Sequence, residues 1–135
     1  MNRPTLVLFD LDEVLVGYDH GARVAHLAQA TGTSAEAVHA ALYISGFERD
    51  ADRGLFDGPQ TLAEFSRRLG APVALQHWID ARRAAMQPRP DVLALAHAAA
   101  RQARVAILTN NGLLLREHLA QMHPPLFPLF SGRVF

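Results

Sequence analysis

Two aspartates at the end of an apolar run are the side chains in this sequence best suited to chemistry. Asp10 and Asp12 are separated by one residue and directly follow the apolar residues 5–9. In an extended segment their side chains would face opposite ways, but a tight turn after Asp10 can bring both into one pocket. One carboxylate can then attack an electrophile while the other exchanges protons. A hard cation such as Mg²⁺ prefers such oxygen ligands and would link them to a phosphate.

A second polar cluster follows a second apolar run. Residues 105–108 are apolar at every position and are followed by Thr109 and Asn110. Their hydroxyl and amide groups can stabilise charge on phosphoryl oxygens, and the same residues suit the start of a helix. Paired aspartates likewise suit a turn or a helix cap. In a parallel sheet, ligands bind outside the carboxyl ends of the strands, so we expect both clusters at one edge.

Strands must position these clusters. A run that is apolar at every position is typical of a strand buried on both faces of a parallel sheet, and residues 5–9 and 105–108 both fit this pattern. Residues 129–135 are expected to begin a third strand. The sequence therefore predicts an α/β fold with a parallel sheet.

Helical periodicity dominates the sequence between the strands. Thr33 with Glu36, and Thr61 with Glu64, fit capping boxes that would each begin a helix. Apolar spacing predicts further helices around Trp78, across residues 92–99 and across residues 112–122. The first two strands are roughly 95 residues apart, whereas a simple βαβ unit needs only about 30. We therefore expect residues 18–88 to be a helical insertion over the strand ends.

The motifs resemble those of the haloacid dehalogenase-like (HAD) hydrolase superfamily. Its first motif is an apolar strand followed by Asp-x-Asp-x-Thr/Val, which residues 10–14 match. Its second is an apolar strand that ends in Ser or Thr, usually followed by Asn, which Thr109 and Asn110 match. The helical insertion looks like the family's cap, and residues 47–56 resemble the cap segment of small sugar-phosphate phosphatases.

The resemblance implies a fold, a reaction and a set of roles. Residues 1–17 and 89–135 would form a Rossmann-like core, with residues 18–88 as an α-helical cap. The chain would hydrolyse a small phosphomonoester with Mg²⁺.

Within that reaction, each candidate site residue has an implied role. Asp10 would be the nucleophile that forms an aspartyl-phosphate, and Asp12 would protonate the leaving oxygen and then activate water. The Asp10 carboxylate and the Asp12 carbonyl would hold the Mg²⁺. Phosphoryl oxygens would be bound by Leu11, Thr109 and Asn110.

Departures from the family pattern leave alternatives open. Glu13 stands where the family commonly has glycine, the chain contains no lysine for the third motif, and no aspartate follows Asp91 for the fourth. Arg116 and Arg133 are the nearest candidates to replace the lysine. The simplest interpretation is a C-terminally truncated hydrolase. The alternatives are a 2-haloacid dehalogenase, in which Asp10 attacks carbon and no metal is required, and an inactive HAD fragment that only binds a ligand or partner.

Composition limits the other function classes. The chain has 135 residues, is 50% hydrophobic and 19% charged, and balances 13 basic against 13 acidic residues, so it has no net charge to attract nucleic acid or an anionic membrane. It has no cysteine, which excludes disulfides and thiolate sites. No apolar run reaches the roughly 18 residues of a membrane span. The expected location is cytoplasmic and the expected partner a small phosphorylated metabolite.

The first strand has a further implication. If no later strand covers residues 5–9, that strand is an apolar edge with unpaired backbone groups, which is a template for pairing. The sequence therefore predicts that the chain is not a stable monomer: it would form a homodimer or aggregate through this edge, or need a further segment to cover it.

Overall fold

A parallel pair of strands brings the two polar clusters to one edge. Strand β1 (Leu6–Phe9) pairs with β4 (Arg104–Ile107) so that Phe9 lies opposite Ile107. The end of the chain extends the sheet, because Val134 bridges Ile107 in parallel. The predicted α/β class, the parallel sheet and the start of its third strand are confirmed.

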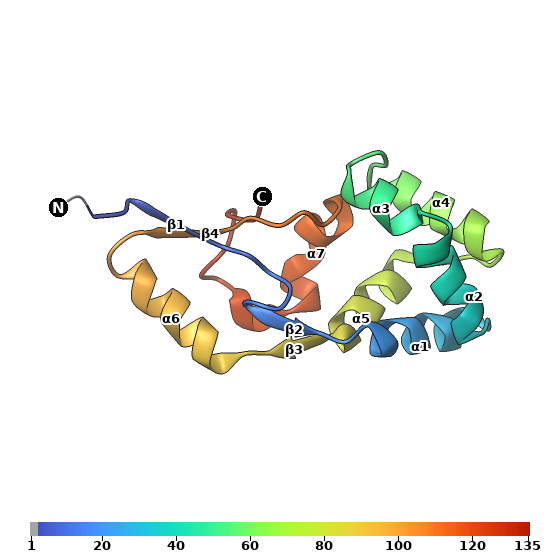
Figure 1. Cartoon of the computed structure of the whole chain (residues 1–135), viewed down its shortest axis with the longest axis horizontal. Coiled ribbons are helices and arrows are strands. Elements are labelled where there is room, and N and C mark those ends of the chain that lie inside the picture. The colour runs from blue at the N-terminus through green and yellow to red at the C-terminus, as the bar shows by residue number, and fades with distance from the viewer. Residues whose placement is uncertain (1–2) are drawn as a thin grey trace.

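The structure is a computed structural model that describes residues 3–135. Figure 1 shows α1 to α5 gathered at one end of the molecule, with β1, β4 and α6 at the other. No helix within the described part of the chain is long and apolar enough to cross a membrane. The remaining elements are β2 (Val16–Tyr18), α1 (His20–Thr31), α2 (Ala35–His39), the π-helix η1 (Ala40–Ile44), α3 (Phe47–Asp52), α4 (Gly58–Leu69), α5 (Leu75–Ala85), β3 (Met86–Pro88), α6 (Pro90–Ala100), α7 (Leu113–Met122) and the 3₁₀-helix η2 (Pro124–Leu126).

Two short strands join the helical segment, which runs from α1 to α5, to the rest of the chain. β2 and β3 are antiparallel, with Val16 opposite Pro88 and Tyr18 opposite Met86. The chain therefore enters and leaves the helical segment side by side (Figure 1). The sequence does not predict this ribbon, because three residues are too few to establish an alternating pattern.

Two helices begin at different residues from those predicted. Ser34, not Thr33, caps α2, and its hydroxyl accepts an amide hydrogen bond from the first turn at 3.1 Å. Asp57, not Thr61, caps α4, and it forms a reciprocal capping box with Gln60. Both corrections have the same cause: serine and aspartate are better N-caps than threonine.

An aromatic cluster forms the centre of the helical segment. The ring of Phe65 lies 5.3 Å from that of Phe47 and 5.3 Å from that of Trp78. Phe56 stacks on Phe47 at 5.9 Å. Phe47 and Phe65 are fully buried. The expectation that Trp78 belongs to this core is confirmed.

One face of the sheet is exposed, which contradicts the prediction that β1 is buried on both faces. Leu6 and Leu8 are 46% and 51% exposed. Leu108 and Phe135 lie on the same face and line a shallow apolar groove with them. Among residues 3–135, β1 pairs with β4 alone. An apolar run shows that a strand is suited to burial but not whether both faces are covered. Pairing of two copies through this edge stays a prediction.

The turn after the second aspartate is strained. Glu13 has a backbone φ of 63°, in the left-handed region that favours glycine. Its side chain nevertheless makes contacts that a glycine could not, because it accepts a hydrogen bond from the Tyr18 amide at 3.0 Å and pairs with Arg89 at 2.6 Å. Both contacts are largely exposed, so they contribute little stability.

We expect Glu13→Gly to be more stable than Glu13→Ala by about 1 kcal/mol. Both variants lose the carboxylate, but only glycine relieves the left-handed backbone. Urea denaturation of the two variants measures the difference in the free energy of unfolding. Equal stability would mean that the turn relaxes without cost when the side chain is shortened.

Candidate active site

An open groove at the carboxyl ends of β1 and β4 contains three of the predicted site residues. Its volume is about 530 Å³, and Asp10, Thr109 and Asn110 line it. The strand register explains this proximity: Phe9 lies opposite Ile107, so the segments after both strands leave the sheet together. The structure thus brings the predicted nucleophile and two predicted phosphate-binding residues to one place.

Asp10 lies at the start of a tight turn, as predicted from its spacing to Asp12. The Leu11 carbonyl accepts a hydrogen bond from the Leu15 amide at 3.0 Å, which turns the chain immediately after the strand. The Leu11 amide donates to Asp10 Oδ1 at 2.8 Å. Leu11 was predicted to bind a phosphoryl oxygen, and in this structure its amide holds the Asp10 carboxylate. The other Asp10 oxygen makes no hydrogen bond within residues 3–135.

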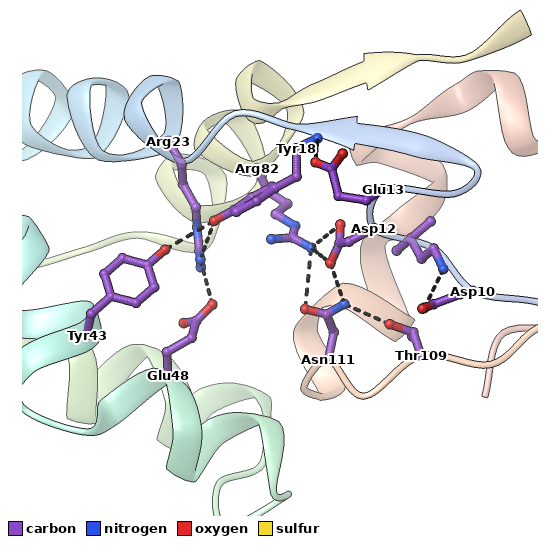
Figure 2. A network of polar contacts seen from close by, with 11 residues as sticks. Asp10, Asp12, Glu13, Tyr18, Arg23, Tyr43, Glu48, Arg82, Thr109 and Asn111 are labelled. Atoms are coloured by element: carbon purple, nitrogen blue, oxygen red, sulfur yellow. Dashed lines mark hydrogen bonds and ion pairs between the residues drawn. The ribbon is translucent and has the colours of Figure 1, made fainter.

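Asp12 is held by an arginine of the helical segment. Arg82 Nη2 donates to Asp12 Oδ2 at 2.9 Å and to Oδ1 at 3.0 Å. Asn111 Nδ2 also donates to Asp12 Oδ2, at 3.0 Å. Both carboxylate oxygens therefore accept hydrogen bonds, as an ionised carboxylate does. Figure 2 shows the three side chains meeting from α5 and from the loops after β1 and β4.

The network continues from Asn111 to Thr109. Asn111 Nδ2 donates to Thr109 Oγ1 at 2.7 Å, and Asn111 Oδ1 accepts from Arg82 at 3.3 Å (Figure 2). Thr109 is thus linked to Asp12 through one amide side chain. The predicted phosphate-binding threonine and the predicted proton-transfer aspartate belong to one hydrogen-bonded group.

Arg82 and Asn111 were not among the predicted site residues. The candidates to replace a lysine were Arg116 and Arg133, but both are exposed, and Arg133 lies beside the apolar sheet face. Arg82 is only 4% exposed. A signal was present: Arg82 shares the predicted helix face of Trp78, and a cation on an apolar face needs a buried partner.

A small cavity lies behind this network, on the side of the helical segment. Its volume is about 30 Å³, which is enough for about one water molecule, and Asp52, Arg82 and Asn111 are among the residues that line it. Arg23 also lines it, where it pairs with Glu48 at 2.6 Å. The cavity is therefore bounded by charged groups of both signs.

Asp52 is the acid of this cavity whose protonation is most perturbed. The pKa of Asp52 is raised to about 6: burial is the largest cause and the nearby Glu48 carboxylate adds to it, while Arg23, Arg82 and the Gly112 amide act in the opposite direction. The balance favours the neutral form because removing the carboxylate from water outweighs the attraction of the arginines.

Stability should therefore depend on pH through Asp52. Its pKa is higher in the folded than in the unfolded state, so its stabilising contribution is complete below about pH 4 and is lost as pH rises through about 6. We expect the free energy of unfolding of Asp52→Asn to fall less than that of the parent chain across this window. Denaturant titrations from pH 4 to pH 8 test this, with Asp50→Asn on the same helix as the control for charge removal. Parallel profiles for the parent and Asp52→Asn would contradict the assignment.

The predicted metal ligands fit Mg²⁺ only in part. Asp10 Oδ1, which accepts one hydrogen bond from the Leu11 amide and has a second lone pair, and the Asp12 carbonyl, which accepts no backbone hydrogen bond from residues 3–135, are hard donors of the kind that Mg²⁺ prefers. The part of the chain that the structure describes contains no group of three acidic or histidine side chains that could hold a metal. Two protein ligands would leave most positions of the ion to water or substrate.

Known structures show the same fold. A predicted HAD-like family hydrolase from Porphyromonas gingivalis is 20% identical, with a TM-score of 0.71 over 96% of this chain and 64% of that one. A HAD family enzyme from Bacteroides thetaiotaomicron, solved in complex with magnesium and inorganic phosphate, is 14% identical, with a TM-score of 0.68 over 87% of this chain and 58% of that one. No family model matches the sequence, and no curated protein matches it significantly.

These likenesses establish the fold. The chain folds as HAD-like hydrolases do, so the resemblance inferred from its motifs is confirmed at that level. The chain spans about three-fifths of the length of these solved structures.

Proposed function

We propose that this chain carries out Mg²⁺-dependent hydrolysis of a small phosphomonoester through an aspartyl-phosphate, with residues 18–88 as a cap over the site. The observation that supports this most directly is the shared groove, in which a free carboxylate oxygen of Asp10 lies with Thr109 and Asn110 at the carboxyl ends of two parallel strands. The magnesium and phosphate bound by a protein of the same fold agree with this chemistry.

The reaction divides into two steps at Asp10. In the first, the free carboxylate oxygen of Asp10 forms a bond to phosphorus as the bond from phosphorus to the leaving oxygen breaks, and Asp12 gives that oxygen a proton. The Thr109 hydroxyl and the Asn110 amide donate hydrogen bonds to the phosphoryl oxygens. Mg²⁺, when bound by Asp10 and the Asp12 carbonyl, would neutralise charge on the phosphoryl group. In the second step, water attacks phosphorus, Asp12 takes the proton, and Asp10 is released.

The observed network suits the second step better than the first. Asp12 accepts hydrogen bonds on both oxygens, from Arg82 and Asn111. An ionised carboxylate in this position can take a proton from water. One of its oxygens must leave these donors and be protonated before Asp12 can protonate a leaving group.

The hydrogen bonds that Asp12 accepts from Arg82 and Asn111 favour one alternative reaction. In a 2-haloacid dehalogenase, Asp10 would attack carbon and no leaving oxygen would need a proton, so an Asp12 occupied by Arg82 would be no obstacle. Release of phosphate from p-nitrophenyl phosphate, with and without Mg²⁺, tests the phosphatase, and release of chloride from 2-chloropropionate tests the dehalogenase. Turnover of neither compound would favour a chain that binds a ligand or partner without catalysis.

A further inference from the structure

Arg82 belongs to the helical segment, yet its hydrogen bonds go to the loops that follow β1 and β4. Its guanidinium donates to Asp12 and to Asn111. Its side chain is only 5% exposed, and its charged group lies over the ring of Tyr18, 4.5 Å from the centroid. The ring holds the guanidinium plane, and the two acceptors define its direction.

The direction of each hydrogen bond follows from this contact. Because Asn111 Oδ1 accepts from Arg82, the amide nitrogen of Asn111 must face Asp12 and Thr109, to which it donates at 3.0 and 2.7 Å. Thr109 Oγ1 is then an acceptor for Asn111, and its own hydrogen must point elsewhere. Thr109 lines the groove with Asp10.

We propose that Arg82 is a positioning residue: it sets the orientation of the Asn111 amide and thereby leaves the Thr109 hydroxyl as a donor to a phosphoryl oxygen in the groove. The choice of ligand rests on the proposed function. The orientation itself rests only on the hydrogen bonds. A rotated Asn111 amide would present its oxygen to Asp12 and to Thr109, which would repel the carboxylate and consume the threonine hydrogen.

Stability alone does not explain why Arg82 is buried here. Its Nε is buried and has no hydrogen-bond partner among residues 3–135. Such an unpaired donor is costly, and a buried ion pair often stabilises a protein little against an apolar substitute. The burial of Arg82 is better explained by the orientation that its hydrogen bond imposes on the Asn111 amide.

The position of Arg82 also makes the geometry of the site depend on how the helical segment packs against the loop after β4. At Gly112, an added Cβ would lie 3.0 Å from the Ala51 carbonyl oxygen, so α3 packs against the loop after β4 without room for a side chain. When the segment is seated in this way, α5 places Arg82 against Asn111 (Figure 2). A displaced segment would remove Arg82 and release the Asn111 amide.

A double-mutant cycle tests the proposal, with inorganic phosphate as the probe and calorimetry as the readout. Arg82→Gln and Thr109→Val should each weaken phosphate binding by about tenfold. If Arg82 acts through the Thr109 hydroxyl, the double variant should bind no more weakly than Thr109→Val alone. Additive losses would overturn the proposal, because they would mean that Arg82 acts through its charge.

The matched control is Arg23→Gln. Arg23 is another buried arginine of the helical segment, but it pairs with Glu48 of the same segment and lies over Trp78. Phosphate affinity should stay within about twofold of the parent in this variant. An equal loss of phosphate affinity in Arg23→Gln and Arg82→Gln would mean that both losses come from a loosened helical segment. That result would also overturn the proposal. If Arg82→Gln does not fold, the same cycle is run with Arg82→Lys, which keeps the charge but not the planar fork.

A second readout separates this proposal from the proposed function. The Nδ2 protons of Asn111, which are hydrogen-bonded to Asp12 and Thr109, should give NMR signals shifted from those of a free amide and show slow solvent exchange in the parent chain and in Arg23→Gln, whereas in Arg82→Gln the signals should move toward free-amide positions and exchange faster. If they do so while the parent binds no phosphate, the positioning role stands and the phosphatase proposal fails. If the signals do not change in Arg82→Gln, the positioning role fails whatever the chain binds.

Discussion

Asp10→Asn is expected to reduce turnover by about four orders of magnitude or more, since the amide that replaces the carboxylate is not a nucleophile. The substitution is nearly isosteric. The asparagine oxygen can still accept the hydrogen bond that the Leu11 amide donates to Asp10 at 2.8 Å. The loss should therefore appear in kcat, with little change in the free energy of unfolding. Phosphate release measures turnover, and mass spectrometry of quenched enzyme should detect a phosphorylated chain only when Asp10 is present.

Asp91→Asn is the control for the loss of one negative charge. Asp91 is exposed in the first turn of α6, where its removal costs only a few tenths of a kcal/mol. Its turnover should match that of the parent. Activity of Asp10→Asn near the parent level would end the aspartyl-phosphate mechanism, and with it the role given to the groove.

Phe47→Ala is expected to lower the free energy of unfolding by about 3–5 kcal/mol. The ring is fully buried and lies within about 6 Å, between ring centroids, of Phe56, Phe65 and Trp78. Its removal leaves a cavity that these large rings cannot all move to fill. Such a loss is a large share of the roughly 5–15 kcal/mol that stabilises an ordinary domain.

Trp78 gives this experiment a local signal, because it is the only tryptophan of the chain and lies in the same cluster. Its fluorescence during urea denaturation reports directly on the helical segment. Ile44→Ala is the control: Ile44 is 75% exposed, and truncating it should cost less than about 0.5 kcal/mol. A loss below about 1 kcal/mol in Phe47→Ala would mean that the cluster is not the core of this segment.

The groove could be predicted from the sequence because it depends on two local patterns and one general rule. Apolar runs that end at Asp10 and at Thr109 indicate buried strands, and parallel strands place their carboxyl ends together. Nothing about side-chain packing is needed for that conclusion. The same holds for α5, whose apolar spacing around Trp78 predicted it.

The role of Arg82 could not be predicted in the same way. Its hydrogen bonds to Asp12 join residues 70 positions apart, and they depend on how α5 is seated against the loops after β1 and β4. Helical spacing places Arg82 on a buried face but does not name its partner. The exposed face of β1 has a similar explanation, because the pattern of a single strand carries no information about the elements that cover it.

The β2–β3 ribbon gives the chain a modular construction. Tyr18 and Met86 lie opposite each other, so their Cα atoms are only about 5 Å apart, and a two-residue turn is enough to close such a gap. The segment between them can therefore be lengthened or exchanged while the two strands keep their pairing. Asp10 and Thr109 would be inherited with the sheet, whereas Arg82 would be inherited with the insert. The two halves of this site can thus have separate evolutionary histories, and a new insert would have to supply its own partner for Asn111.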